Sequence, residues 1–208
     1  MPNLLHISAS PRGELSHSCA VAREFLDDYR AANPSHGIDT IDLWHHDLPA
    51  LDDAAIAAKH AVLRKLPHSD QQAEAWSSIV AEASRLFSYD KLLFSVPMWN
   101  WSIPFVLKRF IDVITQPGVL FEWSPVTGYV GLLKKPVAII YSSSFAYPAD
   151  GDMQGFDHQK SYFEHWLKVI GCNDISTVTI APTAGPEAVV SAAREAARKQ
   201  AKHLALDF

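Results

Sequence analysis

The fold of this chain is indicated most clearly by one stretch, Leu92-Leu93-Phe94-Ser95-Val96-Pro97-Met98-Trp99-Asn100-Trp101-Ser102-Ile103-Pro104-Phe105. Residues 92–96 form a mostly apolar run of strand length, which is typical of a strand buried on both faces. The loop that follows ends at Pro104, and because proline suits the first turn of a helix, a helix is predicted to begin there. The stretch therefore predicts a buried strand, a loop that carries two tryptophans and an amide, and a helix.

The same order of strand, polar loop and helix occurs twice more. Residues 3–9 read as a strand before the loop Ser10-Pro11-Arg12-Gly13-Glu14-Leu15-Ser16-His17-Ser18, and residues 137–140 precede the loop Tyr141-Ser142-Ser143-Ser144-Phe145-Ala146-Tyr147-Pro148. Each loop leaves the carboxyl end of its strand. In a parallel sheet those ends share one edge, where ligands bind, so we expect the three loops to meet in one site.

Strands and helices alternate along the whole chain. Strands are predicted near residues 3–9, 38–43, 91–96, 136–142 and 174–181, and helices near residues 17–32, 52–66, 69–88, 104–116, 157–170 and 186–205. This alternation indicates an α/β fold, a parallel sheet with helices on both faces. Five such strands favour the doubly wound, flavodoxin-like order 2-1-3-4-5. No internal repeat or Gly/Ser-rich linker interrupts the 208 residues, so a single domain over 1–208 is expected.

Charge and composition exclude several classes of partner. The formal net charge is −5 and basic residues are scattered, so no nucleic-acid surface is expected. Four cations of the last predicted helix, Arg194, Arg198, Lys199 and Lys202, are interpreted as suiting the dipole at a helix C-terminus. The longest apolar stretch is interrupted by two prolines and an asparagine, so no membrane contact is predicted. With only two cysteines and no leader-like segment, a cytoplasmic protein is expected.

The loop at residues 10–18 has the chemistry of an anion site. Pro11 and Gly13 favour a turn, and Ser16 and Ser18 are candidate caps of the helix that follows. Hydroxyls and free N–H groups at a helix N-terminus suit a phosphate monoester. The glycine fingerprints of dinucleotide-binding and nucleotide-hydrolysing loops are both missing, which argues against those two functions.

The other two loops suit a flat ring. Trp99 and Trp101 offer planar faces and Asn100 offers both a donor and an acceptor, a combination that a flavin needs. The stretches 117–134 and 145–156 are predicted to be long irregular loops with a function. Their aromatic side chains are predicted to form the substrate wall, since aromatics dominate ligand pockets; these are Phe121, Tyr129 and Tyr147. No metal site is expected, because no spacing of ligands supports one, and no motif of a serine hydrolase is present. No catalytic acid or base is assigned, because a flavin would itself carry out the chemistry.

Taken together, these motifs, with Leu107-Lys108 and Gly118-Val119-Leu120-Phe121, resemble the FMN-dependent NADH-azoreductases, also described as quinone reductases. The resemblance spans nearly the whole chain. It implies a flavodoxin-like homodimer with FMN bound noncovalently near the subunit interface. It also implies ping-pong hydride transfer from NADH or NADPH through FMN to a quinone or azo compound. By position, the cofactor-binding residues are Ser10, Ser16, His17 and Ser18 at the phosphate, Met98, Trp99, Asn100 and Trp101 at the isoalloxazine, and Ser142, Ser143, Ser144 and Phe145 at its pyrimidine side.

Two departures from the family pattern concern the ring site. The family usually has Tyr and Phe where this chain has Trp99 and Trp101, and wider indoles are expected to narrow the substrate pocket. The third loop commonly reads Ser-Arg-Gly-Gly in the family, but ends in Ser144-Phe145 here. Because glycine lets a backbone approach a ring closely, Phe145 is expected to change the path of the loop.

Two other functions remain open from the sequence. A one-electron carrier of the flavodoxin type would share the fold and cofactor but would not oxidise NADH directly. An acyl-carrier-protein phosphodiesterase, a name that related sequences have carried, would require a metal or nucleophile constellation, and none is apparent in the sequence.

Overall fold

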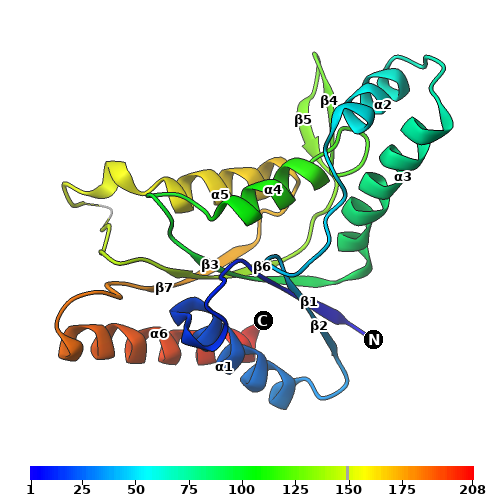
Figure 1. Cartoon of the computed structure of the whole chain (residues 1–208). Coiled ribbons are helices and arrows are strands. Elements are labelled where there is room, and N and C mark those ends of the chain that lie inside the picture. The colour runs from blue at the N-terminus through cyan, green and yellow to red at the C-terminus, as the bar shows by residue number, and fades with distance from the viewer. Residues whose placement is uncertain (149) are drawn as a thin grey trace.

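Five parallel strands form the centre of the computed structural model, which describes residues 1–148 and 150–208 (Figure 1). They are β1 (Asn3–Ser8), β2 (Gly37–Asp42), β3 (Lys91–Pro97), β6 (Val137–Ser142) and β7 (Ile175–Ile180). Their order is β2-β1-β3-β6-β7 and every neighbouring pair is parallel. The predicted order is therefore confirmed.

Helices cover both faces of this sheet. Figure 1 shows α1 (His17–Ala32) and α6 (Glu187–Asp207) on one face and α4 (Phe105–Ile114) and α5 (His158–Val169) on the other. The helices α2 (Asp53–Leu63) and α3 (Asp70–Arg85) pack on each other and extend beyond the sheet on the α4 side. Short 3-10 turns cover Gly13–Leu15, Leu86–Ser88 and Gln154–Phe156.

Alternation along the strands divides the core into two layers. In β3, Leu92, Phe94 and Val96 belong to the hydrophobic cluster beneath α3, α4 and α5. Leu93 belongs to the smaller cluster beneath α1 and α6. Because successive side chains of a strand point to opposite faces, an almost continuous apolar run is what a strand covered on both faces requires.

The expectation of an irregular loop over residues 117–134 is wrong. This segment contains an antiparallel hairpin of β4 (Phe121–Ser124) and β5 (Gly128–Gly131). Figure 1 shows it rising from the side of the sheet that α4 and α5 cover. Two strands of four residues are too short to show a clear alternation in the sequence. The hairpin is held by contacts of β5 with α5 and by the close approach of Gly131 to Gly171, which follows the end of that helix.

His6 is a buried histidine in β1 whose two ring nitrogens face hydroxyl groups on the neighbouring strands. The His6 side chain in β1 is only 5% exposed, and its Nε2 lies 3.0 Å from the Ser95 hydroxyl while its Nδ1 lies 3.5 Å from the Thr40 hydroxyl. Burial lowers the pKa of His6 to about 4, partly offset by the charge of Asp42. The imidazole is therefore neutral in the folded protein at neutral pH.

His6 is expected to make the fold sensitive to mild acid. In the unfolded chain its pKa is 6.5, so between pH 6.5 and 4 the unfolded state binds the extra proton. Stability present above pH 6.5 is thus lost as the pH falls, by about 2 to 3 kcal/mol at pH 4.5. Urea unfolding of wild type and His6→Gln at pH 7.5 and 4.5 measures this. The wild type should lose more stability than the variant over that interval, and equal losses would contradict the assignment.

Candidate functional site

The three loops meet at one polar cavity at the carboxyl edge of the sheet. Its volume is about 130 Å³. The residues that line it are Ser10, Arg12, Ser16 and His17 from the first loop, Pro97, Met98 and Trp99 from the second, Ser142, Ser143 and Ser144 from the third, and Thr183 after β7. Segments more than 170 residues apart in the chain are therefore brought together where a doubly wound sheet binds its ligand.

The structure brings most, though not all, of the expected cofactor residues to this cavity. Ser18 lies fully buried behind Ser16, while the side chains of Asn100, Trp101 and Phe145 are exposed beside the cavity and do not line it. The three residues expected to bind the substrate do not line this cavity. Phe121 and Tyr129 pair on the hairpin with their ring centres 5.4 Å apart, and Tyr147 lines a neighbouring cavity.

The first loop ends in a helix start with free donors. Gly13 adopts a positive φ of 50° in the turn, and Ser16 caps α1 by accepting a hydrogen bond from the Cys19 N–H at 3.3 Å. The Ser18 hydroxyl lies 3.2 Å from that of Ser16. No described residue accepts a hydrogen bond from the backbone N–H of His17 or Ser18. Two amide donors and the positive end of a 16-residue helix are therefore available to an anion.

Cationic side chains add to the positive potential at the start of α1. Burial lowers the pKa of His17, and the positive charges of Arg194 and Arg12 lower it further. Arg12 lines the cavity itself, whereas Arg194 of α6 does not line it but is close enough for its charge to act on His17. Sequence reasoning overlooked Arg12 as a site residue although it lies within the quoted loop. The site thus favours a ligand with negative charge.

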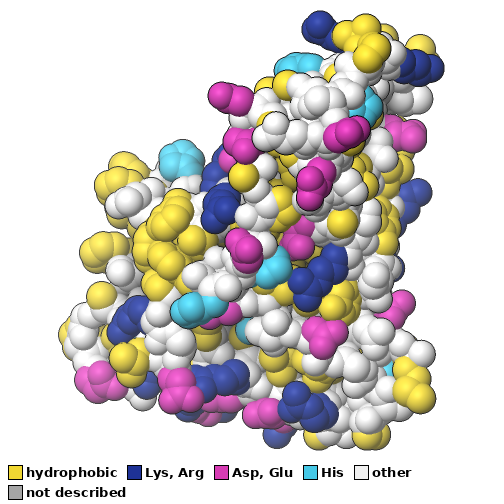
Figure 2. Space-filling model, turned by 45° about the vertical axis from the view of Figure 1, so that its right-hand side comes forward, with side chains coloured by type: hydrophobic (Ala, Val, Ile, Leu, Met, Phe, Trp, Pro, Cys, Tyr) yellow, Lys and Arg dark blue, Asp and Glu magenta, His cyan; other side chains and the backbone are white. Residues whose placement is uncertain are grey.

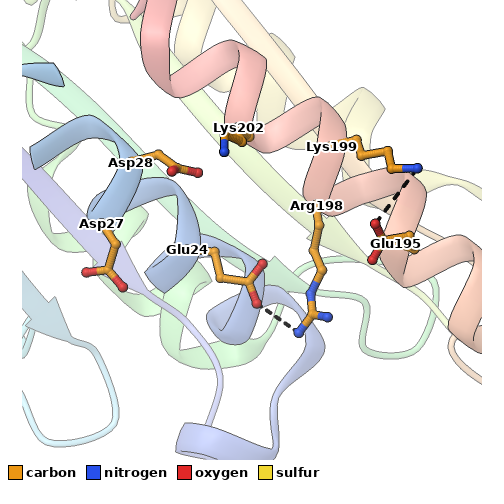
Figure 3. Close-up of a pocket in the computed structure, with 7 residues that line it drawn as sticks. All are labelled: Glu24, Asp27, Asp28, Glu195, Arg198, Lys199 and Lys202. Atoms are coloured by element: carbon orange, nitrogen blue, oxygen red, sulfur yellow. Dashed lines mark ion pairs between the residues drawn. The ribbon is translucent and has the colours of Figure 1, made fainter. Parts of the chain in front are cut away.

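The interpretation of the α6 cations as a C-terminal cluster is wrong. The helix runs to Asp207 and has no basic residue in its last turn. Arg198 instead pairs with Glu24 of α1 at 2.8 Å, and Lys199 pairs with Glu195 at 3.9 Å, as Figure 3 shows. The groove of about 350 Å³ between α1 and α6 is lined by four acidic and three basic side chains, so its basic residues do not form a positive patch. Figure 2 likewise shows acidic and basic side chains interspersed over the visible face.

The second loop is a tight turn that displays aromatic rings. Trp99 and Ser102 exchange two backbone hydrogen bonds of 2.8 and 2.9 Å, and both central residues have positive φ, 46° at Asn100 and 65° at Trp101. This pattern is that of the type I′ turns of tight hairpins. This turn leaves the Trp99 side chain 37% exposed and the Trp101 side chain 53% exposed.

Trp44 is a part of this aromatic surface that sequence reasoning missed. Its ring centre lies 5.5 Å from that of Trp99 and 5.2 Å from that of Phe105, and its Nε1 donates to the Ala9 carbonyl oxygen at 3.0 Å. It therefore joins the first loop to the second. The available signal was its position just after the second predicted strand, at the same edge of the sheet.

The third loop is tied to its neighbours on both sides. The Met98 N–H donates to the Ser142 carbonyl oxygen at 2.7 Å, and the Ser143 carbonyl oxygen accepts from both the N–H and the hydroxyl of Thr183, at 2.9 and 3.1 Å. Neither Ser144 nor Phe145 has a positive φ, so this loop path does not require glycine at either position. Thr183, which sequence reasoning also missed, follows the fifth strand.

These donors fit the phosphate group and flat ring of FMN. The cavity itself is lined mostly by hydroxyls and backbone groups and is sized for a phosphate and part of its attached chain. The Trp99 indole lies at its rim, where a planar ring could stack. Among the described residues, no group of three His, Cys, Asp or Glu side chains is placed to hold a metal ion. His46, for example, is paired with Glu82 at 2.8 Å.

No helix in the described part of the chain combines the length and hydropathy needed to cross a bilayer.

The chain matches the family model described as "Flavodoxin-like fold" over residues 2–204. Its fold is that of an azoreductase from Bacillus anthracis str. Sterne, with a TM-score of 0.90 and 24% identity over the full length of both chains. A B. anthracis FMN-dependent NADH-azoreductase solved in complex with FMN aligns with a TM-score of 0.84 and 23% identity, over 99% of this chain and 100% of that one.

Sequence relatives are considerably closer than these structures. The chain is 40% identical to the "FMN-dependent NADH:quinone oxidoreductase" of Nitratidesulfovibrio vulgaris (strain DP4) over the whole of both proteins. It is 39% identical to "FMN-dependent NADH:quinone oxidoreductase 3" of Pseudomonas fluorescens, over 99% of this chain and 96% of the relative. The resemblance noted in the sequence is thereby confirmed. The chain belongs to the flavodoxin-like family of FMN-dependent NADH:quinone oxidoreductases.

Proposed function

We propose that this protein oxidises NADH and reduces quinones, and azo compounds as a second class of acceptor, in a ping-pong cycle through noncovalently bound FMN. One observation carries the assignment of the site: three loops from separate strands meet where α1 begins with two free amide donors. The names of relatives at about 40% identity over the full chain support the activity.

The phosphate of FMN would be held by the first loop. The Ser10 and Ser16 hydroxyls line the cavity, and the N–H groups of His17 and Ser18 have no other acceptor in the described chain. Arg12 adds a positive charge at the same cavity. Hydrogen bonds to a charged oxygen are roughly twice as strong as neutral ones, so this cradle would supply much of the affinity.

The ring would be held by the other two loops. Bound FMN supplies the group that accepts hydride from NADH and passes it to the acceptor. Met98 and Trp99 would line the isoalloxazine, with Trp44 and Phe105 packed behind Trp99 to exclude water. The side chains of Ser142 to Ser144 would face the pyrimidine side. In this proposal the chain positions the ring, and no side chain is assigned the role of an acid or base.

A homodimer would explain the position of the hairpin. Its apolar side chains project into solvent, with Val126 93% exposed and Tyr129 63% exposed. Exposed apolar side chains on a projecting hairpin are typical of an interaction surface. Contact with a second copy would bring Phe121 and Tyr129 toward the partner's substrate site. The assignment of Tyr147 to the substrate wall stays a prediction. A cytoplasmic location is supported by the two cysteines, which are buried and not joined in a disulfide.

Direct reduction by NADH distinguishes this function from that of an electron carrier. The purified protein, loaded with FMN and kept without oxygen, should lose its yellow absorbance on addition of NADH and regain it on addition of a quinone. Initial rates at several fixed quinone concentrations should give parallel double-reciprocal plots. Bound flavin that NADH leaves oxidised would indicate a carrier and overturn the proposal, and release of phosphopantetheine from acyl-carrier protein would favour the hydrolase.

A further inference from the structure

The cofactor cavity is lined by a histidine whose ring has no partner. His17 is the first residue of α1 and lines the cavity with its side chain half-buried. The rings of His6, His45 and His46 each face a hydroxyl or carboxylate at 3.0 Å or less, but no described residue makes a hydrogen bond or ion pair with the His17 ring. An imidazole can both donate and accept, so this ring is available to a ligand in the cavity.

The charges that act on His17 come from two elements. Arg12 lies in the first loop and lines the same cavity, whereas Arg194 and Glu187 act from α6. The residues that line the cavity from the second and third loops, and Thr183, are uncharged. Burial lowers the pKa of His17 below 6.5, the two arginines lower it further, and Glu187 partly offsets them. The ring is therefore mostly neutral at pH 7 before a ligand binds.

A phosphate group in this cavity would change that balance. The cavity is only about 130 Å³, so a phosphate that accepts hydrogen bonds from the Ser10 and Ser16 hydroxyls would also lie beside the His17 ring. A phosphate monoester has a second pKa of about 6 and is mostly a dianion at pH 7. Nearby negative charge favours the charged form of a histidine and raises its pKa. Phosphate binding and protonation of His17 therefore favour each other.

We propose that His17 is a proton-linked ligand of the FMN phosphate: its ring is neutral in the free protein and takes up a proton as the phosphate binds, so that an imidazolium pairs with the dianion. The inference rests on the proposed phosphate cradle and adds a pH dependence to it. The affinity gained from this pair is present below the pKa of His17 in the complex and is lost as the pH rises through that value. The protein thus retains FMN at neutral pH and releases it more readily in mild base.

Proton uptake on binding tests this directly, without any turnover. FMN is titrated calorimetrically into the flavin-free protein at pH 7 in PIPES and in Tris, whose different ionisation enthalpies reveal how many protons are exchanged. The wild type should take up about half a proton or more per FMN, and its affinity should fall about threefold or more between pH 7 and 8. A site that only selects the dianion would instead release protons, because about a tenth of free FMN is still the monoanion at pH 7.

A substitution and a matched control separate His17 from other titrating groups. His17→Gln keeps a side chain that can form hydrogen bonds but cannot take up the proton. It should bind FMN without proton uptake, and its affinity should change by about twofold at most between pH 7 and 8. His203→Gln, exposed near the other end of α6, should behave like the wild type. Riboflavin lacks the phosphate and should bind all three proteins without proton uptake.

The outcomes distinguish this inference from the cradle on which it rests. Proton release or no net exchange in the wild type overturns the role of His17, and so does uptake that persists in His17→Gln, because the proton would then reside on another group. Tighter binding of FMN than of riboflavin in such a case would leave the cradle in place. Equal affinity of the wild type for FMN and riboflavin would place the phosphate outside this cavity, and both proposals would fail.

Discussion

Replacing Ser16 and Ser18 together by alanine is expected to weaken FMN binding roughly 10- to 150-fold while the chain still folds. The Ser16 hydroxyl lines the cavity, and Ser18 lies 3.2 Å behind it. When Ser18 donates to Ser16 Oγ, the hydrogen of Ser16 is free for an oxygen in the cavity. A hydrogen bond to a charged group contributes roughly 1.5 to 3 kcal/mol. Loss of the Ser16 hydroxyl, together with the Ser18 hydroxyl that orients it, therefore accounts for a weakening of roughly 10- to 150-fold.

The same substitution also removes a helix cap, and its control must separate the two effects. Losing the Ser16 cap costs roughly 1 kcal/mol of folding stability, which circular dichroism and urea unfolding measure. Riboflavin lacks the phosphate, so its affinity should be nearly the same for wild type and variant when flavin fluorescence is titrated. Ser78→Ala, on the exposed side of α3, should change neither affinity. Equal weakening of FMN and riboflavin would place the phosphate elsewhere.

The order of the strands and the position of the site could be predicted because both depend on simple patterns. Buried parallel strands read as apolar runs, and their carboxyl ends share an edge, so the loops after 3–9, 91–96 and 136–142 had to come together. Applied to all five strands, the same rule would have found Trp44 and Thr183, which follow β2 and β7. Those two residues were missed because only the loops with conspicuous motifs were considered.

Other features of the site depend on contacts that no local pattern records. Free amides at His17 and Ser18 follow from how Ser16 caps α1, and the approach of Arg194 follows from the packing of α6 beside α1. The backbone conformation of Trp101 is even harder to predict from the sequence. A left-handed φ is unusual for an indole-bearing residue, and it is maintained here by the paired hydrogen bonds between Trp99 and Ser102.

The hairpin illustrates the same limit, since it depends on a contact between residues 40 positions apart. A methyl group at Gly131 would overlap the backbone of Ile170 and Gly171, and the Leu133 N–H donates to the Ile170 carbonyl oxygen at 2.9 Å. The glycine at 131 is therefore required by close approach of two backbones rather than by a turn. No pattern of residues within 117–134 predicts that contact.

Gly131→Ala is accordingly expected to destabilise the protein by about 3 kcal/mol, because backbone atoms at the contact cannot move aside as a flexible side chain would. Urea unfolding measures the loss. Gly155→Ala is the matched control: its added methyl meets nothing within 4 Å, so stability should stay within about 1 kcal/mol of the wild type. Because no residue of the hairpin lines the cofactor cavity, FMN binding should persist in Gly131→Ala under conditions where the variant is folded, whereas light scattering should show that the proposed homodimer is weakened. A variant as stable as Gly155→Ala would mean that the hairpin is not anchored through this glycine pair. Lost FMN affinity with an intact dimer would mean that the cavity and the hairpin are coupled through the sheet.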